Sequence, residues 1–183
     1  MKTRDEALRL MRSHIAKGNN AKHMIAVGAV MRETAMRLGE DAQKWEVVGI
    51  LHDIDFEACT GLSDHTIKAK ELLQGIVDDE IIEAIMAHNC ENTKVPVNTP
   101  LKKALVACDA VSGLVLASAL VMPSKKLVEV KPESLMKKYN SKDFARNVSR
   151  EKIALCIDIG LPLAEFLPLA LEGMRKVSTE LGL

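Results

Sequence analysis

Apolar residues recur at a helical period along nearly the whole chain of 183 residues. Met24, Val27, Met31 and Leu38 form one such stripe, and similar stripes follow in most later segments. No segment shows the strict alternation of apolar and polar residues that is typical of a half-buried strand. The sequence therefore predicts an all-α protein of about eight helices packed around one core.

Capping residues, glycines and prolines predict where these helices begin and end. Asn20, Asp41, Asp78 and Thr99 are expected N-caps, and Ser63 or Asp64 is expected to cap a further helix. The expected helices cover residues 5–17, 20–38, 42–52, 64–74, 79–88, 100–122 and 133–138, one from 141, one ending at 158, and one from 162 to about 181. Pro168 predicts a kink or a later start in the last of them.

The charge and composition of the chain exclude several classes of protein. It has 25 Lys and Arg against 25 Asp and Glu, so there is no overall field to attract nucleic acid or an anionic membrane. One Trp, one Tyr and three Phe are too few for a base-stacking platform. No run of about 18 apolar residues and no signal-type apolar core occurs. We therefore expect a cytoplasmic protein that binds neither nucleic acid nor membrane.

Four cysteines complete the compositional evidence. Cys59, Cys90, Cys108 and Cys156 show no C-x-x-C spacing, and each lies in or beside a helical pattern. We expect them to be reduced residues that mostly contribute to packing.

A His-Asp pair, His52-Asp53, ends the third expected helix. A neutral imidazole beside a carboxylate suits a hard or borderline divalent metal. Trp45, Val48 and Gly49 share a helix face with His52, so this imidazole projects from the buried face. A polar side chain in that position needs a partner.

Other histidines and one aspartate occupy comparable positions. His23 and His65 lie in first helical turns, His88 ends an apolar stripe, and Asp109 stands where a leucine would be expected. For each residue alone, an ordinary hydrogen-bonded position is the simpler interpretation. Together, on separate helices, they predict a metal centre. Its candidate ligands are His23, His52, Asp53, His65, His88 and Asp109.

Residues 122–152 form the one locally basic stretch, with nine Lys or Arg against four Asp or Glu. The planar guanidinium groups of Arg146 and Arg150 are candidates for binding phosphate oxygens, with Lys125 as a point charge. An ordinary solvated surface is the alternative interpretation of the same stretch.

The order of His23, His52-Asp53 and Asp109 resembles the signature of the HD superfamily of metal-dependent phosphohydrolases, which are all-helical. The intervening His65 and His88 resemble its binuclear branch. The chain also resembles an uncharacterised group of predicted HD hydrolases, through residues 52–57, 107–109, 123–125 and 144–146 with Arg150. This resemblance implies a single HD-type domain over residues 1–183, with a metal-ligand core at about 20–121 and a C-terminal helical extension at 122–183.

The chain departs from two sequence patterns of this superfamily in the residues after His52-Asp53. The glycine and lysine of the HDIG-K pattern of cyclic-dinucleotide enzymes are replaced around Asp55 and Phe56, which disfavours that substrate class. Phe56 also occupies the glutamate position of the HD-x-x-E form found in some deoxynucleotidases. Asp55 or Glu57 is then the candidate that protonates or stabilises the leaving group.

The predicted mechanism has Asp53 bridging two divalent ions, with His23, His52 and Asp109 on one ion and His65 and His88 on the other. Metal-activated hydroxide would hydrolyse a phosphomonoester or phosphodiester, such as a nucleotide or a related small phosphorylated metabolite. The imidazole-rich ligands favour Fe, Mn, Zn or Ni over Mg. Two alternatives stay open: a di-iron oxygenase, since some HD proteins activate oxygen with this ligand order, and a metal-stabilised binding module without turnover.

Overall fold

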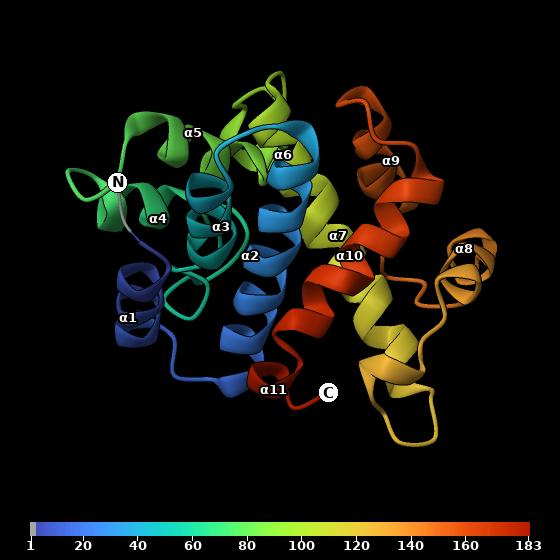
Figure 1. The fold of residues 1–183 in the computed structure, drawn as a ribbon. Coiled ribbons are helices and arrows are strands. Elements are labelled where there is room, and N and C mark those ends of the chain that lie inside the picture. The colour runs from blue at the N-terminus through green and yellow to red at the C-terminus, as the bar shows by residue number, and fades with distance from the viewer. Residues whose placement is uncertain (1–2) are drawn as a thin grey trace.

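A computed structural model of the chain describes residues 3–183, and within them it contains α-helices, one 3-10 turn and no strand (Figure 1). This confirms the all-α prediction. The elements are α1 (Arg4–His14), α2 (Gly18–Leu38), α3 (Ala42–Leu51), α4 (Ile67–Leu73), α5 (Asp79–Ala87), α6 (Cys90–Thr93), α7 (Pro100–Leu120), η1 (Leu127–Glu129), α8 (Pro132–Asn140), α9 (Arg150–Asp158), α10 (Leu163–Lys176) and α11 (Ser178–Leu181). Among these described residues there are eleven α-helices instead of about eight, partly because α6 and α11 are short helices of four residues each.

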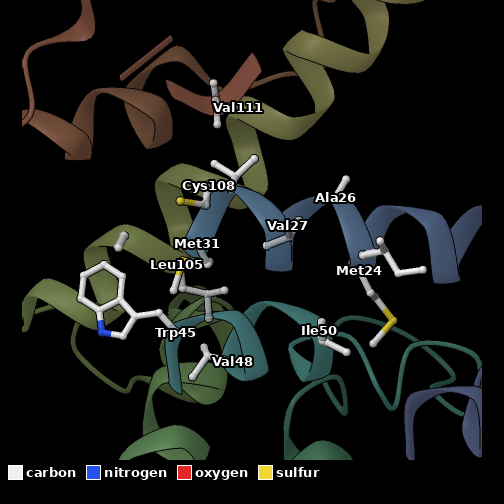
Figure 2. Packing of buried hydrophobic residues seen from close by; sticks show 14 of the residues in the cluster. Met24, Ala26, Val27, Met31, Trp45, Val48, Ile50, Leu105, Cys108 and Val111 are labelled. Carbon is white, nitrogen blue, oxygen red and sulfur yellow. The ribbon is translucent and has the colours of Figure 1, made fainter. Parts of the chain in front are cut away.

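The two longest helices, α2 and α7, are central to the packing. Helix α2 packs against α3, α7 and α10, and α7 also packs against α5 and α9. Figure 2 shows Val27 and Met31 of α2 together with Trp45 of α3 and Leu105 of α7 in the buried apolar cluster. That cluster also includes residues of the N-terminal and C-terminal helices. The apolar stripes that the sequence shows are thus the inner faces of these helices.

Helices α2 and α3 are in close backbone contact where two glycines meet. A Cβ atom added at Gly49 would lie 2.6 Å from the Cα of Gly28, and one added at Gly28 would lie 2.6 Å from the Cγ1 of Ile50. Backbone cannot move aside as a flexible side chain does, so the contact requires glycine at position 49. It brings the N-terminal half of α2 close to the C-terminal end of α3.

Helix α7 is also long and apolar enough to cross a membrane by length and composition alone. However, 61% of its most apolar 18-residue window is buried inside the structure. Helices α9 and α10 pass the same test only as a pair that is bent by 107°. The burial of α7 fits the core helix of a soluble domain.

The expected caps Asp41 and Thr99 are confirmed, whereas Asp78 precedes α5 without a side-chain cap hydrogen bond. Thr3 and Glu6 form the capping box of α1, and the side chains of Asp41 and Thr99 cap α3 and α7. Gly39 and Gly160 adopt positive φ angles of 76° and 85° after α2 and α9. These boundaries depend on short-range hydrogen bonds and backbone conformations that the local sequence specifies.

Two expected caps are wrong because their side chains have other partners. Helix α2 begins at Gly18, while the Asn20 amide donates a hydrogen bond to Glu57. Helix α4 begins only at Ile67, and the carboxylate of Asp64 instead accepts hydrogen bonds from the amides of Thr60 and Gly61.

The C-terminal part differs in two places. No helix begins at Ser141, because residues 142–148 form turns, with Ala145 at a φ angle of 47°. Pro168 lies inside α10, and that helix neither starts later nor ends there: it runs on to Lys176. The predicted later start is therefore wrong, and the proline lies in the second turn of α10.

Candidate metal centre

The structure brings all six predicted ligands together from distant parts of the chain. They come from α2 (His23), the C-terminal end of α3 (His52), the following loop (Asp53 and His65), the C-terminal end of α5 (His88) and α7 (Asp109). Their side chains lie within contact distance of one another through the carboxylates of the two aspartates. The apolar stripes on which His52, His88 and Asp109 stand explain this convergence, since those stripes face a common core.

The carboxylate of Asp53 lies in the middle of the cluster and faces two different sets of imidazoles. Its Oδ2 atom is 3.4 Å from Nε2 of His52 and 3.8 Å from Nε2 of His23. Its Oδ1 atom is 3.3 Å from Nε2 of both His65 and His88. The two oxygens of one side chain therefore each face a separate pair of nitrogen atoms.

Asp109 completes the first of these two sets. Its Oδ1 atom is 3.1 Å from Nε2 of His23 and 3.9 Å from Nε2 of His52. Donor atoms of His23, His52 and Asp109 lie within 4.8 Å of one another, and so do donor atoms of His52, Asp53 and His88. Each of these two groups has the spacing of a possible metal site, and the second combines imidazoles that face different oxygens of Asp53.

Hydrogen bonds at the far side of the rings fix how the imidazoles face the centre. Nδ1 of His52 lies 2.8 Å from the carbonyl oxygen of Gly49, and Nδ1 of His88 contacts the carbonyl oxygen of Ile85. A carbonyl oxygen only accepts, so each Nδ1 must carry the hydrogen, and each neutral ring presents the lone pair of Nε2 to the centre. This arrangement, with an acceptor behind each ring, is typical of histidines that bind metals.

Two observations show that these residues fit a cation. The buried Nε2 atom of His52 has no hydrogen-bond partner among the described residues. Nε2 of His65 and Nε2 of His88 lie only 3.1 Å apart. Because each of these rings uses its Nδ1 hydrogen elsewhere, two lone pairs face each other unless a proton or a metal ion lies between them.

The charges of the cluster hold protons when no metal is bound. Burial alone would lower the pKa of His52, but the carboxylates of Asp53 and Asp109 outweigh it and raise that pKa to about 9. Burial would likewise lower the pKa of His65, but Asp53 and Asp55 outweigh it and raise that pKa to about 9. A divalent ion would displace such protons and take over the favourable interaction with the carboxylates.

The carboxylates stay ionised in this environment. Burial would raise the pKa of Asp53, but the neighbouring imidazoles, above all His52, hold it well below its ordinary value. Burial would also raise the pKa of Asp109, but a hydrogen bond from His23 and the charge of His52 outweigh it and lower that pKa. Both groups are therefore available as anionic oxygen ligands.

The centre is open to solvent on one side only. The side chains of His23 and Asp109 are 34% and 32% exposed, whereas that of His52 is 1% exposed. His65 and His88 are similarly buried. A ligand therefore has to approach between α2 and α7.

The structure does not support a catalytic role for Asp55 or Glu57. Asp55 is fully buried and accepts hydrogen bonds from the amides of Thr66 and Ala69, at 2.6 and 3.0 Å, while its Oδ1 faces Nδ1 of His65 at 3.0 Å. It is a positioning residue for His65, with no oxygen free for a leaving group. Although burial would raise the pKa of Asp55, hydrogen bonds from His65 and Thr66 lower it, which makes it a poor acid.

Glu57 lies at the junction of α1 and α2 instead. Its carboxylate accepts hydrogen bonds from the amides of Ala16 and Lys17, at 3.0 and 2.8 Å, and from the side chain of Asn20. These contacts tie the loop after α3 to the start of α2, which carries His23. Glu57 therefore supports the position of a ligand and does not face the centre.

The contacts of Arg150 do not support its predicted phosphate-binding role. Its guanidinium donates hydrogen bonds to six backbone carbonyl oxygens, those of Lys138, Tyr139, Ser141, Phe144, Ala145 and Val148. All three nitrogen atoms are used, so none is free for a phosphate. Lys125 and Arg146 are exposed, and no hydrogen bond or ion pair joins either side chain to the centre in the described part of the chain. Their role stays a prediction.

A third group of possible ligands, Asp55, Cys59 and His65, overlaps the second set. Burial, together with the negative charge of Asp55, raises the pKa of the Cys59 thiol to about 12. Metals bind the thiolate form, which such a shift disfavours. The centre of imidazoles and carboxylates is therefore the better site.

Two supporting residues were not predicted from the sequence. Asn89 donates hydrogen bonds to the carbonyl oxygens of Leu62 and His65, and so fixes the loop that carries His65. Ser112 lies 3.5 Å from Nδ1 of His23 and donates to the carbonyl oxygen of Asp109. Ser112 shares the face of Asp109 on its helix, a pattern that was visible in the sequence, whereas Asn89 had only its position after His88 as a signal.

Comparison with known proteins gives one match. A protein-family model described as HD domain matches residues 20–114. This range is just over half of the 183 residues and contains all six residues of the centre. No curated protein and no solved structure matches the chain significantly.

Proposed function

The chain belongs to the HD domain family, a superfamily of metal-dependent hydrolases, and on this premise we propose that it is a phosphohydrolase. Its substrate would be a phosphomonoester or phosphodiester, such as a nucleotide or a related small phosphorylated metabolite. The observation that carries the proposal is the carboxylate of Asp53, whose two oxygens face two separate sets of imidazoles.

The same geometry supports two metal ions. One ion would be held by His23, His52, Asp109 and Oδ2 of Asp53, and the other by His65, His88 and Oδ1 of Asp53. The unpartnered Nε2 of His52 belongs to the first set, and the facing nitrogen atoms of His65 and His88 belong to the second. Each set thus contains an atom that lacks a suitable hydrogen-bond partner among residues 3–183. Imidazole-rich ligation favours Fe, Mn, Zn or Ni over Mg.

When bound, divalent ions would supply the Lewis acid that activates water and neutralises charge on the phosphoryl group. The residues of the chain hold and orient this centre. Asp55 fixes His65 from behind, and the carbonyl groups of Gly49 and Ile85 fix His52 and His88. The exposed side at His23 and Asp109 admits the phosphoryl group, while the buried side excludes water.

The reaction adds one water molecule across the ester bond. The water oxygen joins the phosphorus atom, the ester P–O bond breaks, and the alcohol leaves with a proton. Products are inorganic phosphate, or a phosphomonoester when the substrate is a diester, and the free alcohol. Positioning and charge neutralisation account for most of the catalysis of such reactions.

The test is metal analysis combined with a substrate panel. The purified protein is stripped of metal and reloaded with Fe, Mn, Zn, Ni or Mg, and phosphate release is measured on nucleotides, dinucleoside polyphosphates, sugar phosphates and alkyl phosphates. We expect one or two tightly bound ions per chain and hydrolysis of at least one class. A fully loaded protein that cleaves no member would contradict the proposal, as would iron-dependent oxygen consumption without hydrolysis, which would indicate an oxygenase.

A further inference from the structure

A pocket of about 450 Å³ lies between α2, α7, α10 and α11, and His23 is part of its lining. We propose that this pocket binds the organic group of the phosphoester substrate, and that this group is a hydrocarbon chain or ring with few polar atoms. The inference deepens the proposed phosphohydrolase function and rests on it. It adds the substrate class, which the family match does not supply.

The pocket adjoins the metal centre on the side that is open. His23 lines both the pocket and the centre, and the hydroxyl of Ser112, another lining residue, lies 3.5 Å from Nδ1 of His23. The exposed side chains of the centre are those of His23 and Asp109. A phosphoryl group that enters there has the pocket directly beside it.

The pocket also extends away from the centre. Ser112, Leu116 and Leu120 all line it and are spaced four residues apart on α7, in continuation of the face of Asp109. Eight residues of helix correspond to about 12 Å. The pocket is therefore long enough for a group well beyond the first atoms of the ester.

The chemistry of the walls favours an apolar occupant. Leu116, Leu120, Met174 and Leu181 line the pocket, and the polar side chains besides His23 are Asn19, Lys22 and Ser112. The Ser112 hydroxyl already donates a hydrogen bond to a backbone carbonyl, at 2.7 Å. Such walls leave the hydroxyls of a sugar or polyol without partners, at a cost in binding free energy.

The exposure of two leucines supports this choice. Leu116 and Leu120 are 39% and 48% exposed although they lie on a mostly buried helix. Covering them with a hydrocarbon removes apolar surface from water on both partners. Lys22 also lines the pocket, and its exposed ammonium lies beside Gly182 on the wall formed by the C-terminal residues.

A series of n-alkyl phosphates tests the proposal. Ethyl, butyl and hexyl phosphate have leaving alcohols of nearly equal pKa, so differences in rate report binding of the chain and not intrinsic reactivity. We expect kcat/KM of the metal-loaded protein to rise on the order of threefold per methylene group. A flat series, or a preference for sugar phosphates of similar size, would overturn the proposal.

Two substitutions locate the effect in the pocket. Leu116→Gln and Leu120→Gln change half-exposed side chains that the fold does not require, which circular dichroism will check. We expect each to flatten the dependence on chain length, because hexyl phosphate loses a larger fraction of its kcat/KM than ethyl phosphate does. Ile157→Gln, at a 55% exposed position on α9 outside the pocket lining, is the matched control. A chain-length dependence that survives both leucine substitutions would overturn the proposal.

Alkylphosphonates separate this inference from the function on which it rests. Their C–P bond is not hydrolysed, so calorimetry of the metal-loaded protein measures binding alone. We expect hexylphosphonate to bind at least tenfold more tightly than methylphosphonate, and Leu116→Gln to reduce the ratio. If no ester is cleaved but hexylphosphonate binds more tightly by this ratio, the hydrolase proposal fails and the assignment of the pocket to a hydrocarbon group is supported. If ethyl phosphate is cleaved but chain length affects neither rate nor binding, the assignment of the pocket fails and the hydrolase proposal is supported.

Discussion

The metal centre gathers polar groups from distant parts of the chain, whereas the turns around Arg150 gather them from residues 138–148 alone, and donors meet acceptors only in the second case. Around Arg150, the guanidinium N–H donors meet carbonyl acceptors. At the centre, imidazole lone pairs meet other acceptors, as between His65 and His88. Matched groups stabilise a fold by themselves, whereas facing acceptors require a cation. The comparison separates a structural polar cluster from a ligand site.

Arg175 repeats the arrangement of Arg150 elsewhere in the C-terminal part. Its guanidinium donates hydrogen bonds to the carbonyl oxygens of Leu127, Val128 and Val130. These carbonyls belong to η1 and its flanks, and those around Arg150 belong mainly to turns and the end of α8. Both arginines thus supply donors that regular secondary structure would otherwise provide.

Removal of the central carboxylate is expected to have the largest effect. Asp53→Ala takes an oxygen ligand from both sets, so we expect loss of bound metal and a fall in kcat/KM on the order of a thousandfold. Metal analysis and phosphate release measure the two effects. Asp143→Ala, at an exposed aspartate, is the matched control and is expected to leave both unchanged. Full metal content in Asp53→Ala would refute the assignment of the centre.

The stability of the metal-free protein is expected to depend on pH. The pKa of His52 is about 9 in the folded protein against an ordinary value of 6.5, so the folded state binds this proton more tightly than the unfolded chain. Its stabilising contribution is complete below pH 6.5 and is lost as the pH rises towards 9. We expect Tm of the metal-free protein to fall by several degrees across this range.

Metal should reverse that dependence, because the ion competes with protons for the same imidazoles. Metal affinity is therefore expected to rise over the same pH range in which the metal-free protein loses stability. Calorimetric scans of both forms at several pH values measure this. Parallel Tm curves for the two forms would show that the cluster does not exchange protons for metal.

Replacement of Arg150 tests the cluster in which donors and acceptors match. Arg150→Met leaves several carbonyl groups without donors, and we expect the free energy of unfolding to fall by about 2–3 kcal/mol. The kcat/KM of the folded protein should not change. Urea denaturation measures the first effect, with Arg146→Met at an exposed position as the control. An unchanged stability with a raised KM would restore the phosphate-binding role.

The contact between α2 and α3 gives the smallest of these effects. In Gly49→Ala the new Cβ meets the backbone of Gly28, so the two helices must separate, at a cost of about 2 kcal/mol. Because His23 and His52 stand on these helices, metal affinity should fall as well. Gly18→Ala is the control, since nothing lies within 4 Å of a Cβ there. A Gly49→Ala protein as stable as the wild type would mean that the contact does not set the ligand spacing.

The helices and the ligand positions were predictable because both depend on short-range patterns. His52 and His88 end apolar stripes, and Asp109 interrupts one, so their direction follows from helical geometry alone. Stripes of this kind also predicted the buried faces of α2 and α7.

The supporting contacts were not predictable, because they depend on how loops fold back. Asp55 receives hydrogen bonds from amides 11 and 14 residues later, and no local pattern places those amides beside it. Arg150 was expected to bind phosphate because its charge is visible in the sequence, while its acceptors depend on turns that contain Ala145 in a left-handed conformation. The sequence likewise predicts Asp64 as a helix cap, but its carboxylate oxygens accept hydrogen bonds from the loop that precedes it.

The hydrogen bonds behind His52 and His88 have one more consequence. Each ring is oriented by a carbonyl three residues earlier in its own helix, so segments 49–52 and 85–88 are self-contained modules. The orientation of each ring relative to its own helix therefore depends on no residue outside its segment. His65 depends on a side chain ten residues away, across a loop. Changes in the length of that loop would therefore disturb the second set of ligands first, and a protein with one working ion site could evolve from one with two by this route alone.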